Sequence, residues 1–157
     1  PILLWRVIEG AVVPESARLG VSQIVWSPVA QGVLTGKYLP GQPVPEGSRA
    51  TDKRGGADMI KRFMNDDLLS RVQGLRPIAT SLGLTMGQLA VAWVLQNPNV
   101  AGAIVGASRP EQIKENVKAT GVRIPAEMMT RIDEILGDAV VRDPGKTRET
   151  SPQQRPC

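Results

Sequence analysis

One segment of this 157-residue chain combines the residue types that bind a phosphate group. Gly106 allows close approach of a ligand to the backbone, Ser108 offers a hydroxyl, and Arg109 offers a guanidinium with several donors. A predicted helix begins at the same place, and its free N–H groups and positive dipole end favour an anion. Gln112 and Asn116 lie one turn apart on that helix, where their amides suit hydroxyl groups or base edges. The alternative is a capped surface helix with incidental polar residues.

A second segment reads W-S-P-V-A-Q-G-V-L-T-G-K-Y, from Trp26 to Tyr38, and contains the pair Gly36–Lys37. This pair does not form a P-loop, because that motif requires glycine where Gln31 stands and serine or threonine where Tyr38 stands. No G-x-G-x-x-G sequence follows either predicted strand, so the Rossmann fingerprint is absent as well.

Composition excludes several kinds of chemistry. The chain has no histidine, which removes histidine metal sites, Ser-His-Asp triads and Cys-His pairs, and we expect no metal site and no catalytic residue here. The net charge is +4, but the basic residues are scattered and few aromatic residues could stack on bases, so a small polyanion is a better partner than nucleic acid. Cys157 is the single cysteine of the sequence, so it cannot form an internal disulfide. The longest apolar run, Leu89–Leu95, is far shorter than the roughly 20 residues of a membrane span. We therefore expect a cytoplasmic protein with no membrane partner.

Short strands alternating with helices predict an α/β fold with a parallel sheet. The clearest strands are Ser22–Trp26 and Ala101–Val105, and Pro1–Leu4 offers a third. Ligands gather where such strands end, which is where both segments lie. We expect a first helix over 9–19 with Gly20 as its cap, either kinked at Pro14 or beginning near it. A second helix is expected over 66–82, closed by Gly83. Further helices are expected over 85–96, opened by a Thr85–Gln88 capping box, over 108–120, opened by a Ser108–Glu111 capping box, and over 125–136. Residues 27–65 are predicted to be a long loop.

The segments W-S-P-V-A-Q-G-V-L-T-G-K-Y and G-A-S-R-P-E-Q-I-K-E-N together resemble the aldo-keto reductase family. The likeness is closest to the branch that includes bacterial general-stress reductases and potassium-channel β subunits. It implies a (β/α)8 barrel with NADP(H) across the carboxyl ends of its strands, and our segments would follow the seventh and eighth strands. A whole barrel takes about 250 residues. The expected fold is therefore α/β, the C-terminal portion of a (β/α)8 TIM barrel over residues 1–137, with a disordered tail over 138–157.

The resemblance also implies roles for individual residues, all in cofactor binding. Trp26 matches the aromatic residue that stacks on the nicotinamide ring, although a tryptophan of the core would give the same sequence. The pyrophosphate loop and its cationic partner correspond to Ser27, Pro28, Val29, Ala30, Gln31, Gly32 and Lys37. Ser48 and Arg49 match a serine–arginine pair near the adenosine phosphate. The group around the 2′-phosphate and adenine corresponds to Gly106, Ser108, Arg109, Gln112, Glu115 and Asn116, of which Arg109 is the least constant in the family.

The catalytic tetrad of the family, an Asp, a Tyr, a Lys and a His, belongs to strands that this chain does not include. Tyr38 and Lys37 are no substitutes, because they stand in the cofactor loop. We expect this chain to be the cofactor-binding portion of an NADP(H)-dependent reductase of aldehydes or ketones, inactive alone and of undetermined oligomeric state. The alternatives are an NADP(H)-sensing module of the potassium-channel β-subunit type and a truncation product without function.

Overall fold

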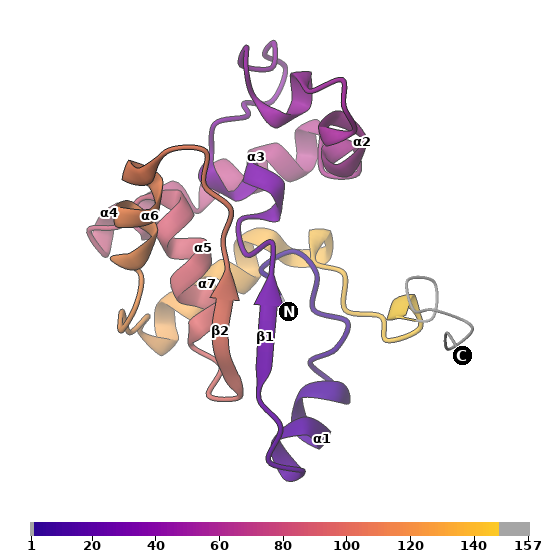
Figure 1. Ribbon diagram of the computed structural model, residues 1–157, viewed down its shortest axis with the longest axis vertical. Helices are drawn as coiled ribbons and strands as arrows, with labels where there is room; N and C mark the ends of the chain where they lie inside the picture. Colours follow the sequence, from indigo (N-terminus) through magenta and orange to yellow (C-terminus); the bar gives the residue numbers. More distant parts are fainter. Residues whose placement is uncertain (1, 148–157) are drawn as a thin grey trace.

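The computed structural model describes residues 2–147, in which helices cover one face of a two-stranded parallel sheet (Figure 1). Strand β1 (Gln23–Trp26) pairs with β2 (Val100–Ile104), and Trp26 lies opposite Ile104. Both predicted strands and the parallel pairing are therefore confirmed. On the covered face Val25 is 5% exposed, because its side chain packs into the helical layer. The parallel direction places the carboxyl ends of both strands at the same edge of the sheet.

Helix α5 (Met86–Leu95) is the central helix of the core. Its residues from Met86 to Val94 are all buried, as expected for a helix that is apolar on every side. The predicted capping box is confirmed: Thr85 Oγ1 accepts from the Gln88 backbone N–H at 3.2 Å, and Gln88 Oε1 accepts from the Thr85 N–H at 2.9 Å. These bonds fix where the helix begins, and the helix then packs against β2.

The single helix predicted over 66–82 is in fact two helices, α3 (Asp66–Gly74) and α4 (Arg76–Ser81). Pro77 lies in the first turn of α4. Proline has no N–H to continue the hydrogen bonds of a helix, and its ring crowds the preceding turn, so the helical hydrogen bonds are interrupted at this point. The prediction failed because the proline was treated as part of one continuous pattern.

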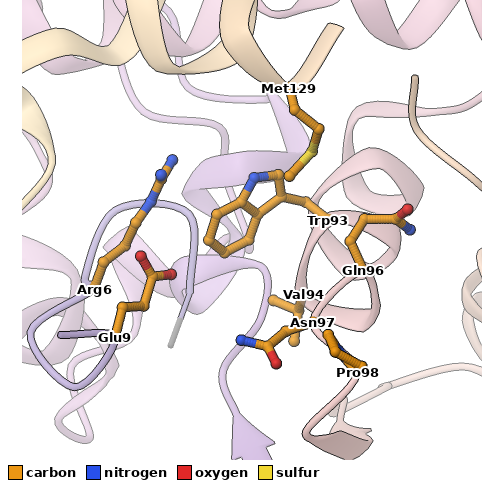
Figure 2. Close-up of a pocket in the computed structure, with 8 residues that line it drawn as sticks. All are labelled: Arg6, Glu9, Trp93, Val94, Gln96, Asn97, Pro98 and Met129. Atoms are coloured by element: carbon orange, nitrogen blue, oxygen red, sulfur yellow. The ribbon is translucent and has the colours of Figure 1, made fainter. Parts of the chain in front are cut away.

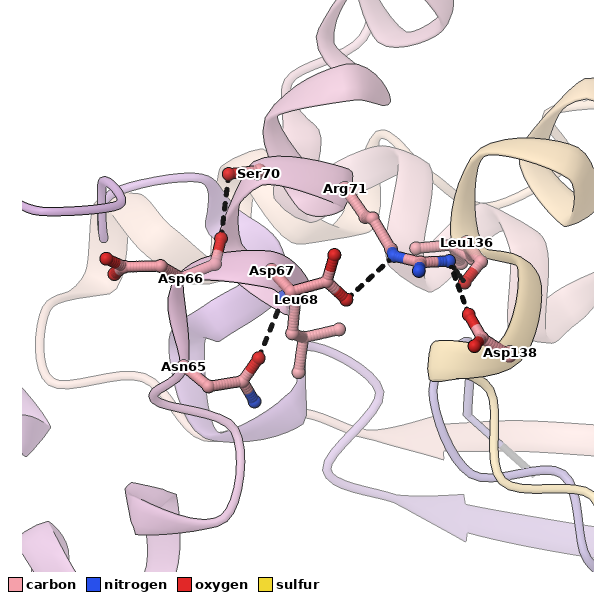
Figure 3. Close-up of polar contacts among 8 residues, drawn as sticks. All are labelled: Asn65, Asp66, Asp67, Leu68, Ser70, Arg71, Leu136 and Asp138. Atoms are coloured by element: carbon pink, nitrogen blue, oxygen red, sulfur yellow. Dashed lines mark hydrogen bonds and ion pairs between the residues drawn. The ribbon is translucent and has the colours of Figure 1, made fainter.

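Helix α3 is capped and tied to the C-terminal part of the described chain, as Figure 3 shows. Asn65 Oδ1 accepts from the Leu68 backbone N–H at 2.9 Å. The Arg71 guanidinium donates to the Leu136 carbonyl at 3.0 Å and pairs with Asp138 at 2.7 Å. These contacts join α3 to the end of helix α7 (Ala126–Leu136), which agrees with the predicted last helix.

The loop predicted over 27–65 contains short helices that sequence patterns did not reveal. They are the 3-10 helices η1 (Ala30–Thr35) and η2 (Arg49–Thr51) and the α-helix α2 (Gly56–Lys61). Each has only one or two turns, so the periodic spacing of apolar residues that identifies a helix cannot develop. Helix α2 packs against both η1 and η2, which holds the long connection against the body of the molecule.

Both ends of the described chain differ from expectation. Ile2 and Trp5 pair with each other in a tight turn, so residues 2–4 add no strand to the sheet, and Pro1 lies outside the described residues. Helix α1 (Val12–Arg18) begins close to Pro14, in agreement with the second of the two predicted starts, and Gly20 and Gly83 have the expected positive φ. Val140 is buried and the Val141 N–H donates to the Leu4 carbonyl at 3.0 Å, so the predicted tail packs on the body as far as this point. The rest of that prediction, residues 148–157, lies outside the described residues.

Candidate functional site

The two segments singled out by sequence start side by side at one edge of the sheet. Ser27 follows β1 and Val105 follows β2, and the last residues of these strands, Trp26 and Ile104, are register partners (Figure 1). The structure therefore brings together two stretches of chain that are far apart in the sequence.

The first segment has an unusual backbone that the sequence did not predict. Ser27, Ala30 and Gln31 have positive φ values of 54°, 48° and 59°, and Gly32 follows at 100°. Positive φ is costly for residues with a Cβ, and such conformations concentrate at ligand-binding loops. The Gln31 amide donates to Ser27 Oγ at 2.7 Å and the Gly32 N–H donates to the Val29 carbonyl at 3.0 Å, which hold the turn closed.

Lys37 folds back over this turn. A Cβ added at Gly32 would lie 3.3 Å from both Cε and Nζ of Lys37, so a side chain at Gly32 would crowd the ammonium group. Lys37 is exposed, and its Nζ also lies 5.2 Å from the centre of the Tyr38 ring. The cation is thus close to the backbone turn after β1 and remains accessible to an anion.

The Ser48–Arg49 pair lies at the start of η2, which packs against α2, and within the described residues no hydrogen bond or ion pair joins the pair to the two segments at the sheet edge. Ser48 is buried and its Oγ has no hydrogen-bond partner among the residues that the structure describes. Arg49 is exposed, and its Nη1 lies 3.8 Å from the Met59 sulfur, a weak acceptor. Because the Met59 sulfur is a weak acceptor, the guanidinium of Arg49 can exchange it for a phosphate oxygen.

At the second segment the N-terminus of helix α6 (Pro110–Val117) is already occupied by a side chain of the same helix. Gln112 Oε1 accepts from the backbone N–H groups of Ser108 at 2.8 Å and Arg109 at 3.3 Å, and lies 3.2 Å from Ser108 Oγ. The predicted Ser108–Glu111 capping box is therefore wrong, because Arg109 is the residue at the N-cap. The expectation that these N–H groups are free is also corrected: an anion would have to displace the Gln112 amide oxygen from them.

The other two residues of this group are placed differently. Glu115 is bound from two sides, since Gln88 Nε2 donates to its carbonyl at 2.8 Å and Lys118 pairs with its carboxylate at 2.6 Å. Asn116 is half-buried on the same helix. Gly106 and Arg109 are exposed ahead of the helix. These positions fit an open binding surface rather than an enclosed pocket.

One helix supports both segments. Gly87, in the first turn of α5, lies under η1, and a Cβ there would be 3.7 Å from Thr35 Cγ2. The next residue, Gln88, bonds to Glu115 of α6. The start of α5 therefore fixes the first segment relative to the second.

A cavity of about 370 Å³ lies elsewhere, among residues of α5, α7 and the segment before α1 (Figure 2). Its lining includes Arg6, Glu9, Trp93 and Met129 and none of the predicted site residues. The Arg6 guanidinium stacks 4.3 Å from the centre of the Trp93 ring and pairs with Asp133 at 2.7 Å. Burial raises the pKa of Glu9 above its ordinary value, and the nearby Arg6 opposes that shift. Sequence analysis did not identify this cavity.

The model of the aldo/keto reductase family matches residues 3–137. The chain belongs to this family. The prediction of an aldo-keto reductase from the two segments is thereby confirmed. Its likeness to the potassium-channel branch is confirmed by the names of its curated relatives.

Curated relatives of this family member include two plant proteins named "Probable voltage-gated potassium channel subunit beta". The protein of Oryza sativa subsp. japonica is 41% identical over 91% of this chain and 42% of its own length. The protein of Arabidopsis thaliana is 44% identical over 73% of this chain and 34% of its own length. The chain thus spans less than half the length of these relatives.

A solved structure shows the same fold. A glycerol dehydrogenase from Gluconobacter oxydans superposes with a TM-score of 0.69 at 22% identity, over 89% of this chain and 41% of that protein. This likeness supports an α/β fold and carries no further functional statement. Within the described residues, no single helix is long and apolar enough to cross a membrane. Residues 66–81 and helix α5 are together long and apolar enough, but they are bent by 83° relative to each other.

Proposed function

We propose that this chain is the cofactor-binding part of an NADP(H)-dependent oxidoreductase that reduces aldehydes or ketones. One observation carries the proposal: the strained turn after β1 and the segment after β2 begin at the same edge of the sheet, and Lys37 lies beside that turn. Parallel α/β folds bind dinucleotides at such edges. The cofactor supplies the hydride, and the residues of this chain bind and orient it.

The residues present fit a dinucleotide phosphate by their chemistry. Lys37 and Arg49 are exposed cations, and Lys37 lies at a turn whose glycine leaves room for it. The amide oxygen of Gln112 occupies the N–H groups of Ser108 and Arg109, just ahead of α6, and a 2′-phosphate could take these groups over. Trp26 is 66% exposed at the end of β1, where its ring offers a flat surface for stacking.

We also propose that the parent fold is a (β/α)8 barrel of which this chain is the C-terminal portion. The sheet face opposite the helices is bare and apolar: Ile24, Trp26 and Ile104 are 68%, 66% and 61% exposed. Helix α6 has no buried residue, and its Ile113 and Val117 are exposed. Apolar surfaces of this kind on a two-stranded sheet suit further strands and helices, as in a barrel. In this interpretation the chain alone reduces no carbonyl compound, because the tetrad belongs to the other strands.

A second candidate function rests on the relatives. The two plant proteins carry the name of a potassium-channel β subunit, and they are 41% and 44% identical to this chain. A protein of that type could bind NADP(H) through the same residues and transmit the bound state to a channel.

The test is cofactor titration of the purified 157-residue chain, followed by tryptophan fluorescence. We expect NADPH to bind more tightly than NADH. Arg49→Ala should weaken NADPH binding about ten- to a hundredfold, because a charge-assisted hydrogen bond contributes roughly 1.5–3 kcal/mol. NADH lacks the 2′-phosphate, so its binding should be nearly unchanged.

Arg54→Ala is the matched control. Arg54 belongs to the same connection, its side chain is 94% exposed, and its ion pair with Asp52 is long at 3.7 Å. Its removal should leave both affinities unchanged. Equal losses for NADPH and NADH in Arg49→Ala would remove Arg49 from the 2′-phosphate site, and a wild-type chain that binds neither cofactor would overturn the proposal.

A further inference from the structure

The carbonyls of Gly36 and Tyr38, the residues before and after Lys37, are both held by one side chain. Gln73, on helix α3, donates through Nε2 to the Gly36 carbonyl at 3.0 Å and to the Tyr38 carbonyl at 3.0 Å. Arg76, on α4, donates to the same Gly36 carbonyl at 3.3 Å and to Gln73 Oε1 at 2.8 Å. Lys37 and Tyr38 thus lie between two held peptide bonds, the one before Lys37 and the one after Tyr38.

These contacts restrict the backbone from which the lysine projects. Gly36 has a φ of 73°, and a Cβ there would lie 3.1 Å from Arg76 Nη2, so the guanidinium occupies the space beside it. Beyond Lys37, the Tyr38 side chain is 1% exposed. The peptide before Lys37 and the one after the buried Tyr38 are both held, so the backbone that carries Lys37 is restricted from two sides. The side chain of Lys37 reaches back over Gly32. A cation with a fixed origin loses less entropy when it binds an anion.

We propose that Gln73 and Arg76 are positioning residues that hold Lys37 for the pyrophosphate of the dinucleotide. This inference rests on the proposed function and adds a second layer of residues to it. Both NADPH and NADH contain the pyrophosphate, so Gln73 and Arg76 act on the two cofactors alike. This separates them from Arg49, which selects between the cofactors.

Gln73 and Arg76 lie on the two sides of the break between α3 and α4. Arg76 Nη2 donates to Gln73 Oε1 at 2.8 Å across this break. Residues three positions apart in helical backbone share one face, so an amide and a guanidinium both reach the Gly36 carbonyl.

The central variant is Gln73→Met, which keeps the length of the side chain and removes its donor. In the 157-residue chain it should weaken NADPH and NADH binding by the same factor, about three- to tenfold, as expected for the loss of a modest hydrogen-bonding contribution. Binding of adenosine 2′,5′-bisphosphate, which has no pyrophosphate, should stay unchanged. In a Lys37→Ala background the same substitution should cost no further affinity, because positioning acts only through the lysine.

Gln96→Met is the matched control for a purely structural role. Gln96 also donates to two backbone carbonyls, those of Ala92 at 2.9 Å and Val122 at 2.8 Å, but at the opposite end of α5 from Gly87. This variant should lower the melting temperature at least as much as Gln73→Met and leave both cofactor affinities unchanged.

The inference and the proposed function fail in different ways. A wild-type chain that binds NADPH, with a Gln73→Met variant that is less stable but binds equally well, overturns the positioning role alone. The positioning role is also overturned if Gln73→Met weakens cofactor binding in the Lys37→Ala background by the same factor as in the wild type. A wild-type chain that binds neither cofactor overturns the proposed function and the positioning role together.

Discussion

Replacing Gln88 with glutamate separates two roles that this side chain combines. Its Oε1 accepts from the Thr85 N–H and caps α5, while its Nε2 donates to the Glu115 carbonyl at 2.8 Å and to Glu115 Oε2 at 3.2 Å. Gln88 is only 4% exposed. Gln88→Glu keeps the capping acceptor, because a carboxylate accepts from the N–H as the amide does. It removes the donor and places a second carboxylate against that of Glu115.

The expected net change at neutral pH is a loss of about 1–1.7 kcal/mol in unfolding free energy. The lost bond to the Glu115 carbonyl contributes about 1 kcal/mol. Two carboxylates at about 4 Å repel by roughly 1–4 kcal/mol, and the lower value applies because the Glu115 side chain is 51% exposed and can move away. Against these, a negative charge in the first turn of α5 stabilises by about 0.3–1 kcal/mol.

Thermal unfolding at several pH values measures this change. A loss of about 1–1.7 kcal/mol lowers the melting temperature by roughly 2–7 °C for a chain of this size. The neighbouring carboxylate and burial raise the pKa of the introduced carboxyl in the folded state. Below its unfolded pKa of about 4.3 the introduced carboxyl is neutral and can again donate to Glu115, so the destabilisation is absent there and develops as the pH rises through the folded value.

Thr85→Ala supplies the comparison, because it removes the N-cap alone. It should cost about 1 kcal/mol at every pH. If Gln88→Glu were as stable as the wild type at pH 7, or destabilised equally at pH 4 and pH 7, the bond to Glu115 would not connect α5 to α6 in the way described.

Three further outcomes follow from the structure. Glu9→Gln should raise the melting temperature at pH 7 and leave it unchanged near pH 4. Burial raises the pKa of Glu9, so its ionisation destabilises the fold as the pH rises above the unfolded pKa. Equal effects at both pH values would contradict this expectation. Gly32→Ala should cost about 1–2 kcal/mol, since φ is 100°, and should weaken NADPH and NADH binding alike by displacing Lys37, as measured by denaturation and titration. With a reactive aldehyde, the purified chain should oxidise NADPH no faster than the protein-free solution.

The sequence predicted those elements whose causes are local. The Thr85–Gln88 capping box, the apolar pattern of α5 and the two β-branched strands each have their cause within a few residues. The same local reasoning failed at Pro77, where one residue outweighs the pattern around it, and at the N-terminus of α6, where Gln112 rather than Ser108 provides the cap. In the first case Pro77 competed with the helical pattern around it, and in the second Ser108 competed with Arg109 and Gln112 for the start of the helix. The sequence alone did not decide which signal prevails.

The support of the candidate site had no local cause to detect. Gln73 and Gly36 are separated by 37 residues, and Gln88 and Glu115 by 27. A glutamine on an amphipathic helix looks like any solvated residue until the fold places a carbonyl against it. The motifs that carry the resemblance therefore named the residues that would touch a ligand, whereas the residues that position them became visible only in the structure.

The start of α5 shows why these supporting residues govern the site. If the cofactor spans both segments, its phosphates meet groups from two stretches of chain whose separation is set by the core and not by either motif. Gly87 contacts η1 and Gln88 bonds to α6, so one helical turn determines that separation. The capping box fixes where this turn begins. The capping box, which can be recognised in the sequence, thus sets the distance between the two segments through the packing of α5. No sequence pattern connects the two segments directly.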